Sequence, residues 1–171
     1  MIRQQKFHLS ISEAGNLQLR IITEYQDDAG KVFDKKYSDA VTPANTKDMT
    51  GWDDRSKAVV EAITDPKVVA DFKIETQNNI IDHGNGLVGT IKYDRVIDED
   101  GKIAVRRITR IFDEGEEVSK KYHRSWIMPG DDYSKADVMS RALAGKLHSV
   151  EVIKAYKAKI AEIEAENVAE K

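Results

Sequence analysis

Two stretches of this 171-residue chain resemble each other, and the second follows the first at a distance of about 85 residues. The resemblance consists of landmarks that recur in the same order in both halves of the sequence. They are Arg20–Asp28 with Arg107–Glu114, Lys35–Tyr37 with Lys120–Tyr122, Ser56–Ala58 with Ser134–Ala136, and Asp65–Phe72 with Ser149–Tyr156. The distance drifts to about 78 residues at the Ser-Lys-Ala pair. Such a repeat predicts that one structural unit occurs twice in tandem.

The first unit is predicted to be a three-stranded antiparallel meander backed by two helices. Apolar and polar residues alternate in Phe7–Ile11 and Leu17–Tyr25, which is the period of a half-buried strand, and a third strand is expected over Val32–Ser38. Short turns join these segments, so the sheet is expected to be antiparallel. Two helices are expected to follow, at about Asp53–Ile63 and from Asp65 onward, and to cover the apolar face of the sheet.

The second unit is predicted to repeat this plan. Its strands are expected near Val88–Ile97, Ile103–Phe112 and Val118–Ile127, with acidic turns between them. From Ser149 the chain contains no glycine or proline, which predicts one long helix at the end of the sequence.

The domain organisation follows from these segments. We expect an α+β fold with a first unit over residues 1–78, a glycine-containing link over residues 79–89, and a second unit over residues 90–171. A chain of this length buries roughly 68–70% of its unfolded surface, which is enough for a stable core.

Composition excludes several classes of protein. The chain has no cysteine, which excludes disulfides, thiolate zinc sites and thiol catalysis. No apolar run approaches the roughly 20 residues of a membrane-spanning helix, so no membrane contact is expected. A formal net charge of −3 argues against a dominant electrostatic role on nucleic acid.

Residues that commonly carry chemistry do not form a known catalytic or metal-binding pattern. His8, His83, His123 and His148 lack the spacing of a zinc ligand set, and Asp98–Gly101 matches only the beginning of a calcium loop. There is no phosphate-binding loop and no nucleophile elbow. The sequence therefore predicts a protein that is not an enzyme and has no metal, no cofactor and no catalytic residue.

Basic residues are frequent on the strands of the second unit and suggest an alternative function. With Tyr122 and Trp126 among them, they are typical of a sheet that binds a phosphate backbone and stacks bases. The candidate contacts are Arg106, Arg107, Arg110, Lys120, Lys121 and Arg124. Against this reading, Lys92–Trp126 holds nine Lys and Arg against eight Asp and Glu, so cross-strand ion pairs explain the pattern equally well.

The final helix carries an apolar stripe. Five residues step by alternating three and four positions, which is the spacing of a coiled coil. They are Ile153, Tyr156, Ile160, Ile163 and Asn167. The stripe predicts either an oligomerisation helix or a core helix whose end frays.

Two longer connections lead from strand to helix, Pro43–Trp52 and Pro129–Tyr133. Loops on a rigid scaffold carry many binding contacts, so Trp52, Tyr133, Asp131 and Asp132 are candidate partner contacts. The two aromatic residues are also expected to fasten their loops onto the sheet.

Three strings in the second half resemble a pattern found in small uncharacterised proteins of tailed phages and prophages. They are Val118–Arg124, Pro129–Asp132 and Val150–Tyr156. The last helix of those proteins often opens with Thr-Pro-Glu-Val, whereas this chain has Ser149–Val152. The resemblance covers about a third of the chain and implies a virion or assembly context without naming a catalytic residue.

Together these observations predict a structural component of a phage particle, at the tail or the head–tail junction. It is expected to contact other virion proteins, to be present in several symmetric copies, and to be located in the virion or in the host cytoplasm during assembly. The alternative is a phage-encoded intracellular binder of nucleic acid or of a host protein.

Overall fold

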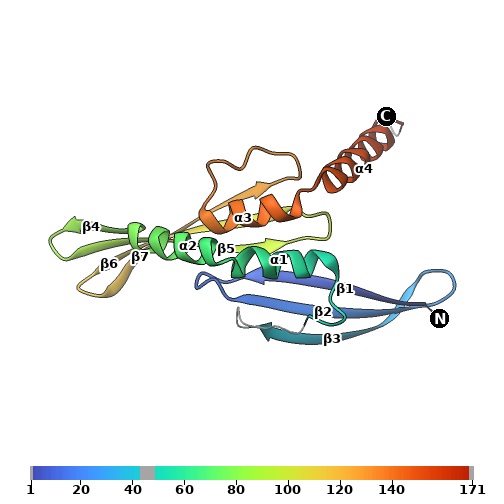
Figure 1. Ribbon diagram of the computed structural model, residues 1–171, viewed down its shortest axis with the longest axis horizontal. Helices are drawn as coiled ribbons and strands as arrows, with labels where there is room; N and C mark the ends of the chain where they lie inside the picture. The colour runs from blue at the N-terminus through green and yellow to red at the C-terminus, as the bar shows by residue number, and fades with distance from the viewer. Residues whose placement is uncertain (1, 43–48, 170–171) are drawn as a thin grey trace.

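The computed structural model describes residues 2–42 and 49–169 (Figure 1). Its strands all belong to one antiparallel sheet of seven strands, with the order β3-β2-β1-β5-β6-β7 and with β4 also paired to β5. The strands are β1 Ile2–Ile11, β2 Leu17–Gln26, β3 Val32–Thr42, β4 Ile80–Gly84, β5 Leu87–Ile97, β6 Ile103–Asp113 and β7 Glu116–Ile127.

The sheet consists of two meanders that join through their first strands. β1 pairs with β5 in antiparallel orientation, with Leu9 opposite Ile97, Ser10 opposite Val96 and Ile11 opposite Arg95. In consequence β2 and β3 extend the sheet on one side of this pair, and β6 and β7 extend it on the other. β3 and β7 end this order, and β4, which among the described strands pairs only with β5, is a further edge strand.

Each meander is followed by two helices. α1 (Asp54–Thr64) and α2 (Pro66–Asn78) follow β3, while α3 (Val138–Leu147) and α4 (Val150–Ala169) follow β7. α1 and α3 pack side by side on one face of the sheet (Figure 1). None of the helices in residues 2–42 and 49–169 is long and apolar enough to cross a bilayer.

Both central helices start in the same way. The side chain of Asp53 accepts a hydrogen bond from the backbone N–H of Ser56 at the start of α1. The side chain of Asp137 accepts one from the backbone N–H of Ser140 at the start of α3. Each aspartate satisfies a backbone donor that the first turn of a helix otherwise leaves without a partner.

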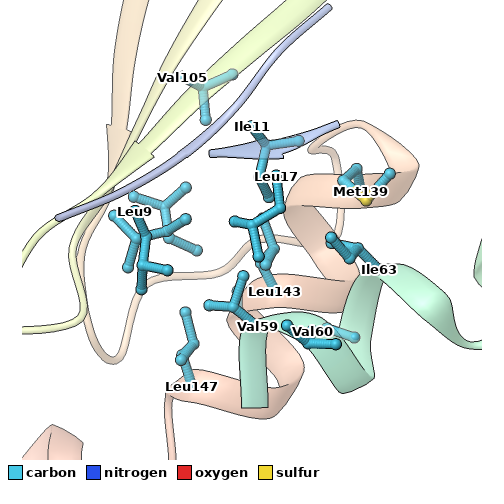
Figure 2. Packing of buried hydrophobic residues seen from close by; sticks show 14 of the residues in the cluster. Leu9, Ile11, Leu17, Val59, Val60, Ile63, Val105, Met139, Leu143 and Leu147 are labelled. Carbon is cyan, nitrogen blue, oxygen red and sulfur yellow. The ribbon is translucent and has the colours of Figure 1, made fainter. Parts of the chain in front are cut away.

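The core lies between the sheet and these two helices (Figure 2). Leu9 and Ile11 of β1 and Leu17 of β2 point toward Val59 of α1 and Leu143 of α3, and all five are almost completely buried. Full burial of one such side chain stabilises the fold by about 1.5–3 kcal/mol. This shared core, supplied by both meanders and both helices, holds the two halves together.

The expected α+β class is confirmed, and two local predictions differ from the structure. Residues 79–89, predicted as a link, form β4 and the beginning of β5, so this segment extends the sheet. Ser134–Ala136, predicted to open a helix, precede α3, which begins at Val138 after its cap Asp137.

Candidate functional site

The helices cover one face of the sheet, and we call the opposite one the open face. Directly paired residues on neighbouring strands point to the same face, and successive residues alternate. The register therefore places one set of side chains from β5, β6 and β7 together on the open face. They are Lys92, Asp94, Val96, Ala104, Arg106, Ile108, Arg110, Lys120, Tyr122, Arg124 and Trp126, of which Ile108 is buried beneath its neighbours.

A groove of about 450 Å³ crosses the open face. Val96, Ala104 and Trp126 contribute its apolar surface, and Ser10 and Gln18 line it from the first meander. The side chain of Trp126 is large and apolar, yet 53% of this residue is exposed to solvent. An exposed aromatic residue beside a groove is a feature of binding surfaces.

Two pairs of like charges lie directly opposite each other on the open face. Arg106 pairs across the sheet with Arg124, and Arg110 pairs with Lys120. Like charges at such positions destabilise a sheet by roughly 0.2–1 kcal/mol per pair. A local cost of this kind is expected at functional sites more than elsewhere.

Two of these four cations are neutralised by acids. Arg106 forms a bidentate ion pair with Asp94. Arg110 donates to both carboxylate oxygens of Glu13 at 2.7 Å and lies 3.1 Å from Glu117. The hydrogen bonds from Arg110 hold the pKa of Glu13 below its ordinary value, and Glu13 in turn raises the pKa of Arg110.

The remaining cations of the open face have no carboxylate partner in the part of the chain that the structure describes. On β5–β7 they are Lys92, Lys120 and Arg124, which are all exposed and form no ion pair in that part of the chain. Lys92 and Lys120 still lie close enough to Glu13 to lower its pKa. Lys120 lies over the ring of Tyr122 at 5.6 Å, and Arg106 lies over the same ring at 5.2 Å. The open face of β5–β7 therefore has an excess of positive charge.

The structure does not gather all of the basic residues that the sequence singled out. Arg107 and Lys121 have the opposite parity to Arg106 and Lys120, so they point to the face that carries the helices. Arg95 also lies on the helix side, and its side chain is completely buried.

Arg95 is the centre of a buried polar network that the sequence analysis did not identify. Its guanidinium group bonds to the carboxylate of Asp137 and donates from Nε to the hydroxyl oxygen of Ser140 at 2.9 Å. Nearby, Glu75 of α2 accepts a hydrogen bond from the backbone N–H of Val138 at 3.0 Å. Burial raises the pKa of Glu75, because the charged carboxylate loses its contact with water.

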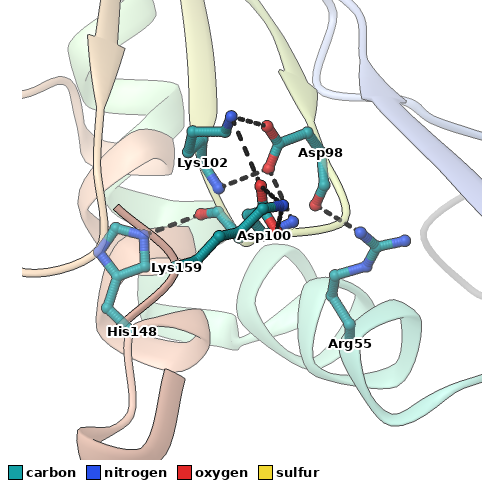
Figure 3. Close-up of polar contacts among 7 residues, drawn as sticks. Arg55, Asp98, Asp100, Lys102, His148 and Lys159 are labelled. Atoms are coloured by element: carbon teal, nitrogen blue, oxygen red, sulfur yellow. Dashed lines mark hydrogen bonds and ion pairs between the residues drawn. The ribbon is translucent and has the colours of Figure 1, made fainter. Parts of the chain in front are cut away.

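The first half of α4 and the connection before it contact the turn between β5 and β6 (Figure 3). Lys159 Nζ lies 2.7 and 2.8 Å from the two carboxylate oxygens of Asp100, which lowers the pKa of that aspartate. A ring nitrogen of His148, between α3 and α4, lies 2.9 Å from the carbonyl oxygen of Gly101. Arg55 of α1 donates to the carbonyl oxygen of Asp98, so this turn links three helices.

The predicted stripe on α4 divides into two parts. Ile153, Tyr156 and Ile160 are half-buried, whereas Ile163 is 43% exposed and Asn167 is exposed. The amide of Asn167 donates to the carbonyl oxygen of Ile163 in its own helix. Figure 1 shows that the second half of α4 extends away from the sheet.

Of the predicted partner contacts in the loops, the aromatic residues are half-buried and the aspartates are exposed. Trp52 and Tyr133 are half-buried and pack against the core, and Tyr133 meets the ring of His148 edge-on at 6.2 Å. Asp131 and Asp132 are exposed, and each accepts a backbone hydrogen bond within its own loop. Residues 43–48 of the first loop lie outside the described residues.

Within the described ranges, no three His, Asp or Glu side chains come together as metal ligands would. The four histidines lie on separate parts of the fold, on β1, β4, β7 and after α3.

No protein-family model, no curated protein and no solved structure matches this chain.

Proposed function

We propose that this chain is a non-enzymatic assembly component of a tailed-phage particle, at the tail or the head–tail junction. The observation that carries the proposal is α4, whose second half leaves the sheet and exposes the apolar side chain of Ile163 to solvent. A helix that is anchored at one end and uncovered at the other is suited to bind a neighbouring molecule. The phage context rests on the resemblance of Val118–Arg124 and Pro129–Asp132 to small phage and prophage proteins.

We further propose that the chain contains two tandem copies of one unit, a three-stranded meander backed by two helices. Each half follows this element order, and the caps support it, because Asp53 and Ser56 in α1 correspond to Asp137 and Ser140 in α3. This correspondence replaces the Ser134–Ala136 landmark with Ser140. A protein with two similar halves offers two similar edges to its neighbours, which favours symmetric assembly.

The charges of α4 favour a second copy of the same helix as its partner. Lysines occupy the first part of the helix and glutamates the second part, at Lys154, Lys157, Lys159, Glu162, Glu164 and Glu166. In an antiparallel pair, Lys157 of one copy comes opposite Glu164 of the other, while Ile160 and Ile163 lie at the seam. The proposal is therefore a self-associating arm.

Charge reversal on α4 tests the arm directly. Sedimentation of the full chain is expected to show self-association that Glu164→Lys weakens and that the double variant Lys157→Glu/Glu164→Lys restores. Deletion of Ala161–Lys171 is expected to leave a monomer. An unchanged mass after this deletion would reject the arm.

The phage context is tested in particles. Mass spectrometry of purified particles of the phage that encodes this chain is expected to detect it in an amount comparable to known structural proteins. Its absence from washed particles would remove the proposed function, whatever the outcome for the arm.

A further inference from the structure

We propose that the open face of β5–β7 binds single-stranded nucleic acid, with phosphates at Lys120 and Arg124 and a base on Trp126. Two like-charge pairs carry the inference, Arg106 with Arg124 and Arg110 with Lys120. In each pair the acids of the protein neutralise one cation, while the other, Arg124 or Lys120, forms no ion pair among the described residues. An anion bound at these two side chains offsets the remaining repulsion.

The acids of the protein form ion pairs with only two of these four cations. Asp94 is committed to Arg106, and Glu13 and Glu117 are committed to Arg110. Lys120 and Arg124 remain exposed on the same face of one strand, four positions and about 13 Å apart along it. Lys92 on β5 adds a third positive charge on the same face, two strands away from β7. This arrangement fits an extended polyanion that follows β7.

The groove favours nucleic acid over an acidic protein segment. An acidic strand bound to the edge of β7 would pair with its backbone and would leave the apolar floor at Val96 and Ala104 uncovered. A nucleotide base can enter the groove and stack on Trp126, while its phosphates stay at the rim beside Arg124. In a duplex the bases are stacked on each other and cannot reach this surface, so a single strand is the expected ligand.

Binding is measured by fluorescence anisotropy with a labelled oligothymidylate of about 12 nucleotides. Three phosphate contacts predict a slope of about −2 in log affinity against log salt, which is roughly a sixteenfold loss between about 50 and 200 mM. Arg124→Gln and Lys120→Gln are each expected to make this slope shallower by about 0.7. Trp126→Ala is expected to weaken binding by roughly fivefold to a hundredfold at all salt concentrations.

The first meander supplies matched controls, because its edge strand β3 carries the same Lys-Lys-Tyr string. Lys35→Gln and Tyr37→Ala remove the side chains that correspond to Lys120 and Tyr122 and that point to the same face of the sheet, and Tyr37 is 61% exposed. Both are expected to bind the oligonucleotide as the unaltered protein does.

Several results would overturn the inference. They are the absence of binding to oligothymidylate, equally tight binding to a DNA duplex of the same length, and an equal loss of affinity in the β3 controls. Binding to poly-glutamate without binding to oligothymidylate would show that the partner is an acidic protein. None of these results depends on whether the chain is found in particles or whether α4 self-associates.

Discussion

The two meanders place opposite charges at corresponding positions of their middle strands. In the first, Glu24 of β2 is almost buried, and its carboxylate lies 3.1 Å from Lys6 and 2.8 Å from Lys35. In the second, the corresponding position of β6 holds Arg110, which faces Lys120 across the sheet. In the first meander this carboxylate pairs with two lysines of the same meander. The second meander takes Glu13 from the turn of the first and still keeps an excess of positive charge.

The serines at the two helix caps also differ in their polar contacts. Ser56 of α1 has a buried hydroxyl oxygen without a hydrogen-bond partner among the described residues, next to an apolar core. Ser140 of α3 accepts a hydrogen bond from the buried Arg95. The comparison indicates that the same cap lies against an apolar core in α1 and beside a buried charge in α3.

The largest expected difference between the halves concerns the two caps. Asp137→Ala removes the partner of the buried Arg95 and is expected to cost about 3–5 kcal/mol of unfolding free energy. Asp53→Ala removes a cap from α1 and is expected to cost only about 1 kcal/mol. Urea unfolding of both variants measures the difference, and equal losses would contradict the distinct role of the second half.

A second variant tests whether the cost of Asp137→Ala comes from the buried charge of Arg95, which loses its partner. Replacing Arg95 with leucine, the type of residue found at Leu9 in β1, removes the charge together with its need for a partner. Asp137→Ala in the Arg95→Leu background is therefore expected to cost less than about 1 kcal/mol, because loss of the cap is offset by removal of a buried carboxylate that no longer has a cation. If Asp137→Ala lowers the unfolding free energy as much in this background as in the original protein, the unpaired charge of Arg95 is not the cause.

The two serines give the next largest contrast. Ser140→Ala leaves Nε of Arg95 buried without an acceptor and is expected to cost about 1–3 kcal/mol. Ser56→Ala removes a hydroxyl group that has no partner and is expected to change stability by less than about 0.5 kcal/mol or to increase it. Urea midpoints of the two variants test this, and a larger loss for Ser56→Ala would show that its hydroxyl is used.

Much of the fold could be predicted from local patterns, and the charged sites could not. Alternation in Phe7–Ile11 and Leu17–Tyr25 identified strands, because such periods depend only on neighbours in sequence. The pairing of β1 with β5 joins residues about 86 positions apart, so no local pattern indicates it. Without that pairing and the register of β6 with β7, the like-charge pairs remain invisible in the sequence.

One signal for the buried network was present in the sequence. Arg95 stands between Tyr93 and Ile97 in the alternation of β5, at the parity that points to the core. A cation at such a position predicts a buried acid partner. The identity of that partner, Asp137, depends on how α3 packs, which the sequence alone does not show.

The smallest expected effect is a difference in pH dependence. Hydrogen bonds from Lys35 and Lys6 hold the pKa of Glu24 below its ordinary value in the folded protein. The stability that Glu24 contributes is therefore complete above about pH 4.3, the ordinary value for a glutamate, and is lost as the pH falls toward the lower folded pKa. Glu75 behaves in the opposite way, because burial raises its pKa: its contribution to stability falls as the pH rises from the ordinary value through the folded one.

Neutral variants at these two positions should consequently change the pH profile in opposite directions. Urea unfolding between about pH 3 and 7 is expected to show a smaller loss of stability in acid for Glu24→Gln than for the unaltered protein. Glu75→Gln, whose amide oxygen can still accept from Val138, is expected to gain stability at neutral pH relative to acid. Glu162→Gln on the exposed part of α4 is the matched control and should leave the profile unchanged. Parallel profiles for Glu24→Gln and Glu75→Gln would contradict the contrast, because one carboxylate is stabilised by lysines and the other is destabilised by burial.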